Sequence, residues 1–150
     1  MNLSTLFRLE ENLHLDKKTL VVLRWIAITG QLAAINLVYN FLNLDFPIVE
    51  SHMIIFTGFI TNIYLQFKIK TVQLSDIYSS LFLLYDLIQL SILLYLTGGI
   101  SNPFSLLLIV PAIVSSTFLS MGTTLILGSI TIVSLFVLAK YSLPLPGLDE

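Results

Sequence analysis

The sequence contains no cysteine, only two histidines and few charged residues. Without cysteine, these 150 residues cannot form disulfides, thiolate metal sites or thiol redox centres. The histidines, His14 and His52, are isolated, so we expect no metal site. Charged residues make up 11% of the chain, against about 25% in an average soluble domain, and this leaves too little polar surface for a protein that sits in water. The net charge of −2 gives no reason to expect nucleic acid as a partner.

Hydrophobic residues, by contrast, make up 56% of the chain. About 20 apolar residues in a helix cross the hydrocarbon core of a bilayer. The sequence therefore predicts an all-α, polytopic integral membrane bundle with five spans, at about residues 20–44, 47–67, 77–97, 103–120 and 123–141. Pro111 lies inside the fourth span and is expected to kink it or leave a carbonyl group free. Because an odd number of spans ending in a proline-rich loop is typical of the front part of a longer protein, we expect a sixth span after residue 150.

The basic residues predict the orientation of these spans. If the N-terminus is cytoplasmic, six basic residues lie on the cytoplasmic side and only Lys140 lies on the other, which satisfies the positive-inside rule. The six are Arg8, Lys17, Lys18, Arg24, Lys68 and Lys70. Residues 1–19 are then a cytoplasmic N-terminal segment, either a short interfacial helix or a partly disordered tail, and residues 20–150 form the transmembrane domain. Arg24, in the first turns of its span, is expected to extend towards the headgroups.

Asp86 is the only ionisable residue well inside a predicted span, near the bilayer midplane. A charge there costs about 2.5–3.5 kcal/mol on insertion scales, so such a residue is a functional candidate. Gln89 lies one turn away on the same face, and Gln31 or Asn62 can approach from neighbouring helices. No basic residue is expected at the same depth, so we predict that Asp86 is mostly protonated. Two interpretations stay open: a functional role, including proton or quinone linkage, and a role in helix packing.

A short polar interruption between the third and fourth spans has the residues of a helix stop, a turn and a helix start. Gly98 and Gly99 allow backbone angles that other residues resist. Asn102 is a favoured N-cap and Pro103 a favoured first helical residue. We predict that one helix ends near Thr97 and the next begins at Pro103. The positive-inside pattern places this loop on the extracytoplasmic side.

The same loop has groups that suit a flat, lipid-soluble ligand. The Asn102 amide can donate a hydrogen bond to a carbonyl oxygen, and Phe104, Tyr95 and Phe118 offer flat apolar surfaces. The glycines would allow a planar ring to approach the backbone closely. From the residues alone, a simple turn with a helix cap is the favoured interpretation of the loop, and a binding site stays open as the alternative.

Three segments carry a resemblance to a known family. The run LYLTGGISNPF (residues 94–104) resembles the Gly-Gly-x-x-Asn-Pro-Phe signature of the RegB/PrrB/ActS redox-sensing histidine kinases. TLVVLRWIAITGQ (residues 19–31) resembles that family's entry into its first transmembrane helix, and YDLIQL (residues 85–90) resembles the segment that leads to the signature. The three matches occur in the family's order and spacing and cover the chain from about residue 19 onward.

The resemblance implies a function beyond what the residues establish. It implies a six-helix sensor domain of a homodimeric histidine kinase in the bacterial inner membrane, with a response regulator as partner. It also implies that Gly98, Gly99, Asn102, Pro103 and Phe104 bind ubiquinone or a related quinone and report the state of the quinone pool. The segment alone would have no catalytic residues, because the phosphoacceptor histidine and the ATP site would follow it. The alternative is a small proton-coupled transporter or membrane assembly subunit that uses Asp86.

Overall fold

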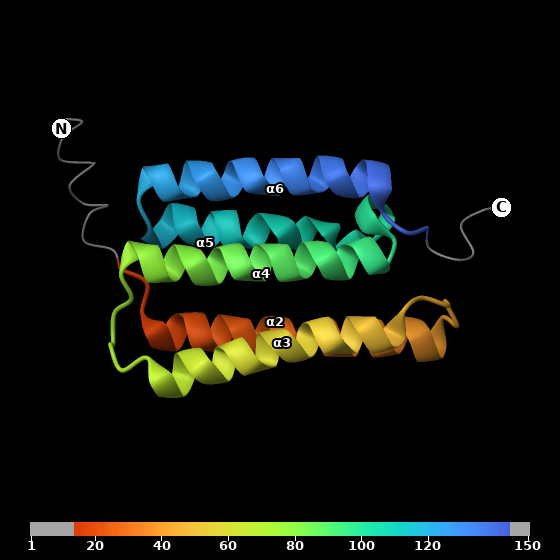
Figure 1. Ribbon diagram of the computed structural model, residues 1–150, viewed down its shortest axis with the longest axis horizontal. Coiled ribbons are helices and arrows are strands. Elements are labelled where there is room, and N and C mark those ends of the chain that lie inside the picture. Colours follow the sequence, from red (N-terminus) through yellow and green to blue (C-terminus); the bar gives the residue numbers. More distant parts are fainter. Residues whose placement is uncertain (1–13, 145–150) are drawn as a thin grey trace.

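A computed structural model describes residues 14–144, and this part of the chain is all-helical apart from an isolated bridge between Asp16 and Gln73 (Figure 1). Its α-helices are α2 (Lys17–Phe41), α3 (Ile48–Lys68), α4 (Asp76–Leu96), α5 (Val110–Phe118) and α6 (Met121–Tyr141), and two 3₁₀ helices, η1 (Gly99–Ser101) and η2 (Pro103–Ile109), lie between α4 and α5. In Figure 1, α2 and α3 lie together on one side, and α4, α5 and α6 on the other. α3 also packs against α4, which joins the two groups.

Four of these helices, α2, α3, α4 and α6, are long and apolar enough to cross a membrane. Their ends lie within about one helical turn of the predicted bounds. The described residues therefore form a multi-pass helical membrane protein. The segment predicted as the fourth span, Pro103–Phe118, is a shorter apolar stretch, so the count of five spans stays a prediction.

This shorter segment begins as a 3₁₀ helix and continues as an α-helix. A 3₁₀ helix rises about 2.0 Å per residue against about 1.5 Å in an α-helix, so Pro103–Phe118 extends about 27 Å, close to the hydrocarbon thickness of about 30 Å. The change to α-helix occurs at Val110, next to Pro111. Pro111 has no N–H to offer the Leu107 carbonyl group, and the Val110 N–H bonds that carbonyl instead. The helix therefore changes type next to Pro111, and the carbonyl group expected to be left free is bonded.

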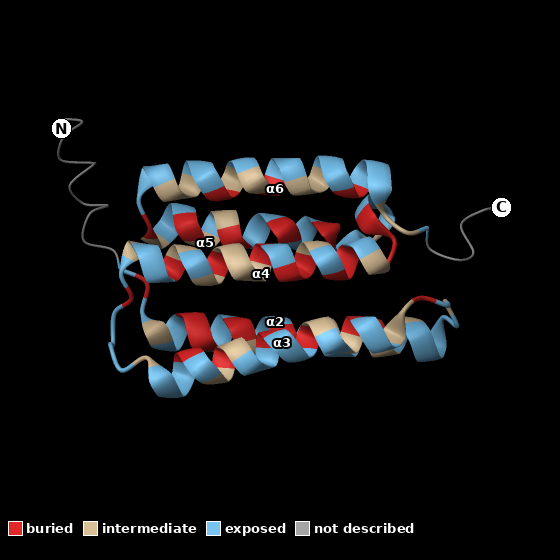
Figure 2. Ribbon diagram, viewed as in Figure 1, coloured by how far each residue is buried: buried red, intermediate tan, exposed pale blue. Residues whose placement is uncertain are grey.

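Buried residues follow the inward faces of the helices, whereas the outward faces carry large apolar side chains (Figure 2). Phe41 is 80% exposed, and Leu106 and Phe136 are each 73% exposed. A soluble monomer rarely shows such extensive apolar surface. Facing lipid, these side chains are in an apolar solvent, as the membrane assignment requires.

The basic residues of the described chain gather at one end of the bundle, where α2 and α4 begin and α3 ends (Figure 1). This end carries Lys17, Lys18, Lys68 and Lys70, whereas Lys140 lies near the C-terminal end of α6 at the opposite end. The arrangement agrees with the charge pattern of the sequence. Which side of the membrane each end faces stays a prediction.

At this basic end the start of α2 is bound to the connector between α3 and α4. The Lys17 ammonium group donates to the main-chain carbonyls of Ile69 (2.6 Å) and Gln66 (3.3 Å), at the C-terminal end of α3. The main-chain N–H of Lys17 donates to Val72 (3.0 Å). The chain thus enters α2 in a fixed position. The interfacial helix or tail considered for residues 1–19 lies largely outside the described residues.

Candidate functional site

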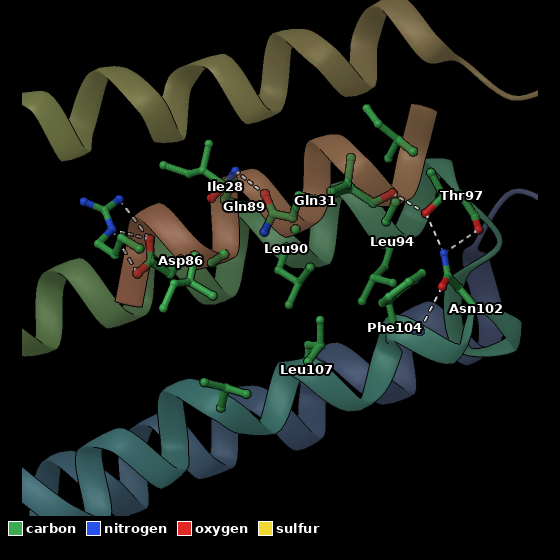
Figure 3. A pocket seen from close by; sticks show the side chains of 18 of the residues that line it. Ile28, Gln31, Asp86, Gln89, Leu90, Leu94, Thr97, Asn102, Phe104 and Leu107 are labelled. Carbon is green, nitrogen blue, oxygen red and sulfur yellow. Dashed lines mark hydrogen bonds and ion pairs between the residues drawn. The ribbon is translucent and has the colours of Figure 1, made fainter. Parts of the chain in front are cut away.

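A cavity of about 550 Å³ lies between α2 on one side and α4, η2 and α5 on the other (Figure 3). Most of its wall is apolar. The polar side chains on the wall are Arg24, Gln31, Asp86, Gln89, Thr97 and Asn102. The cavity therefore brings together two groups that the sequence singled out separately, the intramembrane polar residues and part of the Gly-Gly loop.

Asp86, at one end of the cavity, forms an ion pair with Arg24 of α2. The Arg24 Nε donates to both carboxylate oxygens, at 2.9 and 3.1 Å, and its Nη2 lies 2.9 Å from Oδ1. Nη2 also donates to the Thr61 hydroxyl of α3 at 2.7 Å. The Arg24 side chain is only 4% exposed and that of Asp86 24%. One charged cluster therefore ties α2, α3 and α4 together.

This pair corrects one prediction and removes the premise of another. Arg24 does not extend towards the headgroups: its guanidinium group is buried, and it lies about 5 Å from the ring centres of Phe82 (5.1 Å) and Tyr85 (5.5 Å) of α4. The prediction that Asp86 is mostly protonated assumed no basic residue at its depth, and that premise is wrong. The helix begins at Lys17 rather than residue 20, so Arg24 lies deeper along α2 than the sequence suggested.

A second polar contact crosses the bundle one turn further along α4. The Gln89 Nε2 donates to the Gln31 Oε1 at 3.2 Å and to the Ile54 carbonyl of α3 at 3.4 Å. Gly58 of α3 makes room for it, since a Cβ there would lie 2.9 Å from the Gln89 nitrogen. Asn62, also expected near this face, instead donates to the Val21 carbonyl at 3.2 Å.

The Gly-Gly loop has the predicted stop, turn and start. α4 ends at Leu96, and Gly98 and Gly99 have φ angles of 102° and 59°, which suit glycine. Asn102 caps η2, with its Oδ1 accepting from the Phe104 N–H at 2.9 Å. Its Nδ2 donates to both the carbonyl and the hydroxyl oxygen of Thr97, each at 3.0 Å. The amide that was expected to donate to a ligand is therefore fully used within the loop.

The loop also packs against the end of α6. A Cβ at Gly99 would overlap the Ser142 side chain and lie 2.9 Å from the Leu138 carbonyl oxygen. Past α6, the Leu143 N–H donates to the Tyr95 carbonyl at 3.0 Å. The absence of a side chain at Gly99 thus allows the close approach of α6.

Three of the five suspected quinone-binding residues line the cavity and two do not. Asn102, Pro103 and Phe104 lie on the cavity wall, whereas Gly98 and Gly99 are not among the residues that line it. Tyr95 and Phe118, the other aromatic candidates, do not line it either. Sequence reasoning missed Leu90 and Leu107, which face each other across the cavity in Figure 3. Their only signal in the sequence is their helical spacing from Asp86 and Phe104.

A buried ion pair, an amide pair and an apolar cavity inside a bundle of membrane-length helices define a polytopic membrane protein with an internal ligand-sized site. The chain is 40% identical over 129 residues to the sensor histidine kinase RegB of Cereibacter sphaeroides. It belongs to the RegB/PrrB family of sensor kinases. The likeness covers 85% of this chain but 28% of the relative's length. No protein-family model and no solved structure matches the chain.

Proposed function

We propose that this chain is the membrane-embedded input domain of a two-component sensor histidine kinase in the bacterial inner membrane, with its N-terminus in the cytoplasm. The identity to RegB supports this assignment, and the four long apolar helices agree with it. Because the chain spans 28% of that relative, a kinase region, dimerisation and a response regulator are part of the proposal. On this view the chain detects a signal in the membrane and passes it to a kinase elsewhere in the full protein.

The signal we propose is the redox state of a quinone bound in the cavity. Its volume of about 550 Å³ lies within the range of roughly 300–1,000 Å³ typical of small-molecule sites, which are mostly apolar with a few well-placed polar groups. The wall has this composition, with Phe104 from the loop at one end and the charged pair at the other. The observation that carries the proposal is that the family's signature loop opens onto this cavity.

The fold gives such a ligand a route to the rest of the chain. A ligand shifts a signalling equilibrium only if it binds the two states with different affinities. The proposed quinone would touch α2, α4 and η2 at once. Because the Leu143 N–H, just after α6, is bonded to the Tyr95 carbonyl in the last turn of α4, a shift of α4 relative to η2 would move the chain beyond residue 142.

The test is a quinone titration of the 150-residue chain in lipid nanodiscs, followed by emission of Trp25, its single tryptophan. Leu107→Phe fills the cavity and is expected to weaken saturable binding at least tenfold. Leu106→Phe is the matched control, because Leu106 is 73% exposed and does not line the cavity. Phe104→Ala should also weaken binding. Equal binding by both leucine variants would contradict this site.

The transporter alternative gains no support from Asp86. A carboxylate that carries protons must exchange its hydrogen-bond partners as it gains and loses a proton. The Asp86 Oδ1, in contrast, lies 2.9 Å from both Nε and Nη2 of Arg24. The family relationship also points to a sensor. We therefore retain the sensor assignment.

A further inference from the structure

The hydrogen-bonding groups of Asn102 are all occupied by the loop itself. Its oxygen accepts from the Phe104 N–H, and its nitrogen donates to both Thr97 oxygens. An amide nitrogen has two N–H donors, and here each has an acceptor. A ligand carbonyl could therefore accept a hydrogen bond from Asn102 only by breaking the contacts that shape the loop.

Gln31 presents the opposite situation in the middle of the cavity. Its oxygen accepts from Gln89, but its Nε2 has no hydrogen-bond partner within the described residues. In Figure 3 this amide nitrogen points into the space between α4 and η2. This N–H is accessible from the cavity and free to donate, and a ligand that covers it without supplying an acceptor would pay for its lost hydration.

We propose that the Gln31–Gln89 amide pair, and not Asn102, holds a carbonyl oxygen of the quinone. This inference rests on the proposed function and identifies the polar contact of the same site. Gln89 is 6% exposed and fixed against Gly58 of α3, so it holds the Gln31 oxygen and leaves the Gln31 nitrogen turned to the cavity. The donor is thus pre-oriented, and binding would not cost the side-chain entropy of a free glutamine.

The neighbouring charged pair supports a polar head group at this level. Arg24 lines the cavity, its side chain is 4% exposed, and its Nη1 is buried without a hydrogen-bond partner among residues 14–144. Asp86 and Gln89 are one turn apart on α4, about 4.5 Å along the axis. The part of the cavity that lies between the Leu90 and Phe104 side chains then remains for the hydrocarbon part of the ligand.

The amide pair also distinguishes the two redox forms of the ligand. A quinone carbonyl only accepts hydrogen bonds and suits the Gln31 nitrogen, whereas a quinol hydroxyl also donates. If both amides turn by half a rotation, Gln31 presents its oxygen to a hydroxyl donor and still bonds Gln89. Gln89 then loses its bond to the Ile54 carbonyl of α3. A quinol that donates to Gln31 therefore weakens the contact between α3 and α4, whereas a bound quinone leaves it intact.

In this arrangement Asn102 is a positioning residue. It caps η2 and so places Phe104 on the cavity wall. Its loss would disturb the wall and weaken binding without changing the hydrogen bond to the bound carbonyl. Affinity alone therefore cannot separate the two roles, but the carbonyl stretching frequency of the ligand can.

The experiment uses decylubiquinone, ¹³C-labelled at its carbonyls, bound to the 150-residue chain in nanodiscs. Infrared spectra report whether a bound carbonyl receives a hydrogen bond, and Trp25 emission reports affinity. Gln31→Met is expected to abolish the downshift of one carbonyl band and to raise Kd about three- to tenfold, the effect of one neutral hydrogen bond. It should also reduce the ratio of quinone to quinol affinity. Asn102→Ala should raise Kd but retain the downshift. Asn40→Leu, which removes an exposed amide of α2 outside the cavity, should change neither.

A downshift that persists in Gln31→Met and disappears in Asn102→Ala would overturn this inference while leaving quinone binding intact. If the wild-type chain shows no saturable binding, the proposed function itself fails. Circular dichroism checks the helix content of each variant. If Gln31→Met does not fold, Gln31→Asn withdraws the donor by one methylene group while keeping a neutral amide, and the same loss of downshift is required.

Discussion

Removing one partner of the Arg24–Asp86 ion pair should destabilise the bundle far more than removing both. The pair is buried within three helices, and Arg24 is the less exposed partner, at 4% against 24% for Asp86. Asp86→Leu would leave the guanidinium group with Thr61 as its one side-chain acceptor among the residues that the structure describes. Arg24→Met would leave a carboxyl group that still reaches the cavity. The two single variants are therefore unequal.

Truncating one side of a buried pair costs about 3–5 kcal/mol, whereas replacing both sides by apolar residues is often neutral. Arg24→Met leaves the more exposed partner, Asp86, unpaired, so its cost should be near the lower limit, about 3 kcal/mol. Asp86→Leu leaves the more buried partner, Arg24, unpaired, so its cost should be near the upper limit, about 5 kcal/mol. The double variant should be more stable than Asp86→Leu alone, which requires a coupling free energy of at least about 3 kcal/mol.

The measurement is reversible unfolding in mixed micelles titrated with sodium dodecyl sulfate, followed by circular dichroism and by Trp25 emission. Lys18→Met is the control, because it removes an exposed charge from the same helix. Additive effects of the two single variants, or an Arg24→Met effect no larger than that of Lys18→Met, would refute the pair as a stabilising contact. Infrared spectra give an independent check: a protonated-carboxyl band that disappears in Asp86→Asn would contradict the ion pair.

Three other substitutions test contacts away from the charged pair. Gly99→Ala places a Cβ on Ser142 at a φ of 59°, so it should lower the free energy of unfolding by about 1–3 kcal/mol and lower the midpoint of the same titration. Gly58→Ala crowds the Gln89 amide, at 2.9 Å from its nitrogen, and should raise Kd for decylubiquinone severalfold with little loss of helix content by circular dichroism. Lys17→Met removes hydrogen bonds to the carbonyl groups of Gln66, in the last turn of α3, and Ile69, just after it. It should cost about 1 kcal/mol, with faster amide hydrogen exchange confined to that helix end.

Much of the fold could be predicted because it depends on local chemistry. Long apolar runs predict the four long helices, and Asn102 followed by Pro103 predicts the start of η2 with the observed side-chain cap. Two glycines predict the left-handed backbone that ends α4. Each of these features depends on residues that are close together in the sequence.

The contacts between helices could not be predicted in the same way. Whether Arg24 meets Asp86 depends on the rotation and relative depth of α2 and α4, and hydropathy determines neither. The Asn102 nitrogen donates to Thr97 because the turn brings these two residues together, and the N-cap pattern does not specify that contact. Residue type identified the polar groups of the cavity, but only the packing shows which of them are free to bind.

η2, the segment that follows the Gly-Gly loop, is a 3₁₀ helix of seven residues. Runs of this helix longer than about four residues are uncommon, and such stretches often mark hinges. Rewound as α-helix, Pro103–Ile109 would be about 3–4 Å shorter. Its side chains would also turn about the axis, because an α-helix advances by about 100° per residue and a 3₁₀ helix by about 120°. Phe104 and Leu107 would then point in different directions relative to α4. A change of helix type in this one segment would therefore change the shape of the cavity wall that they form.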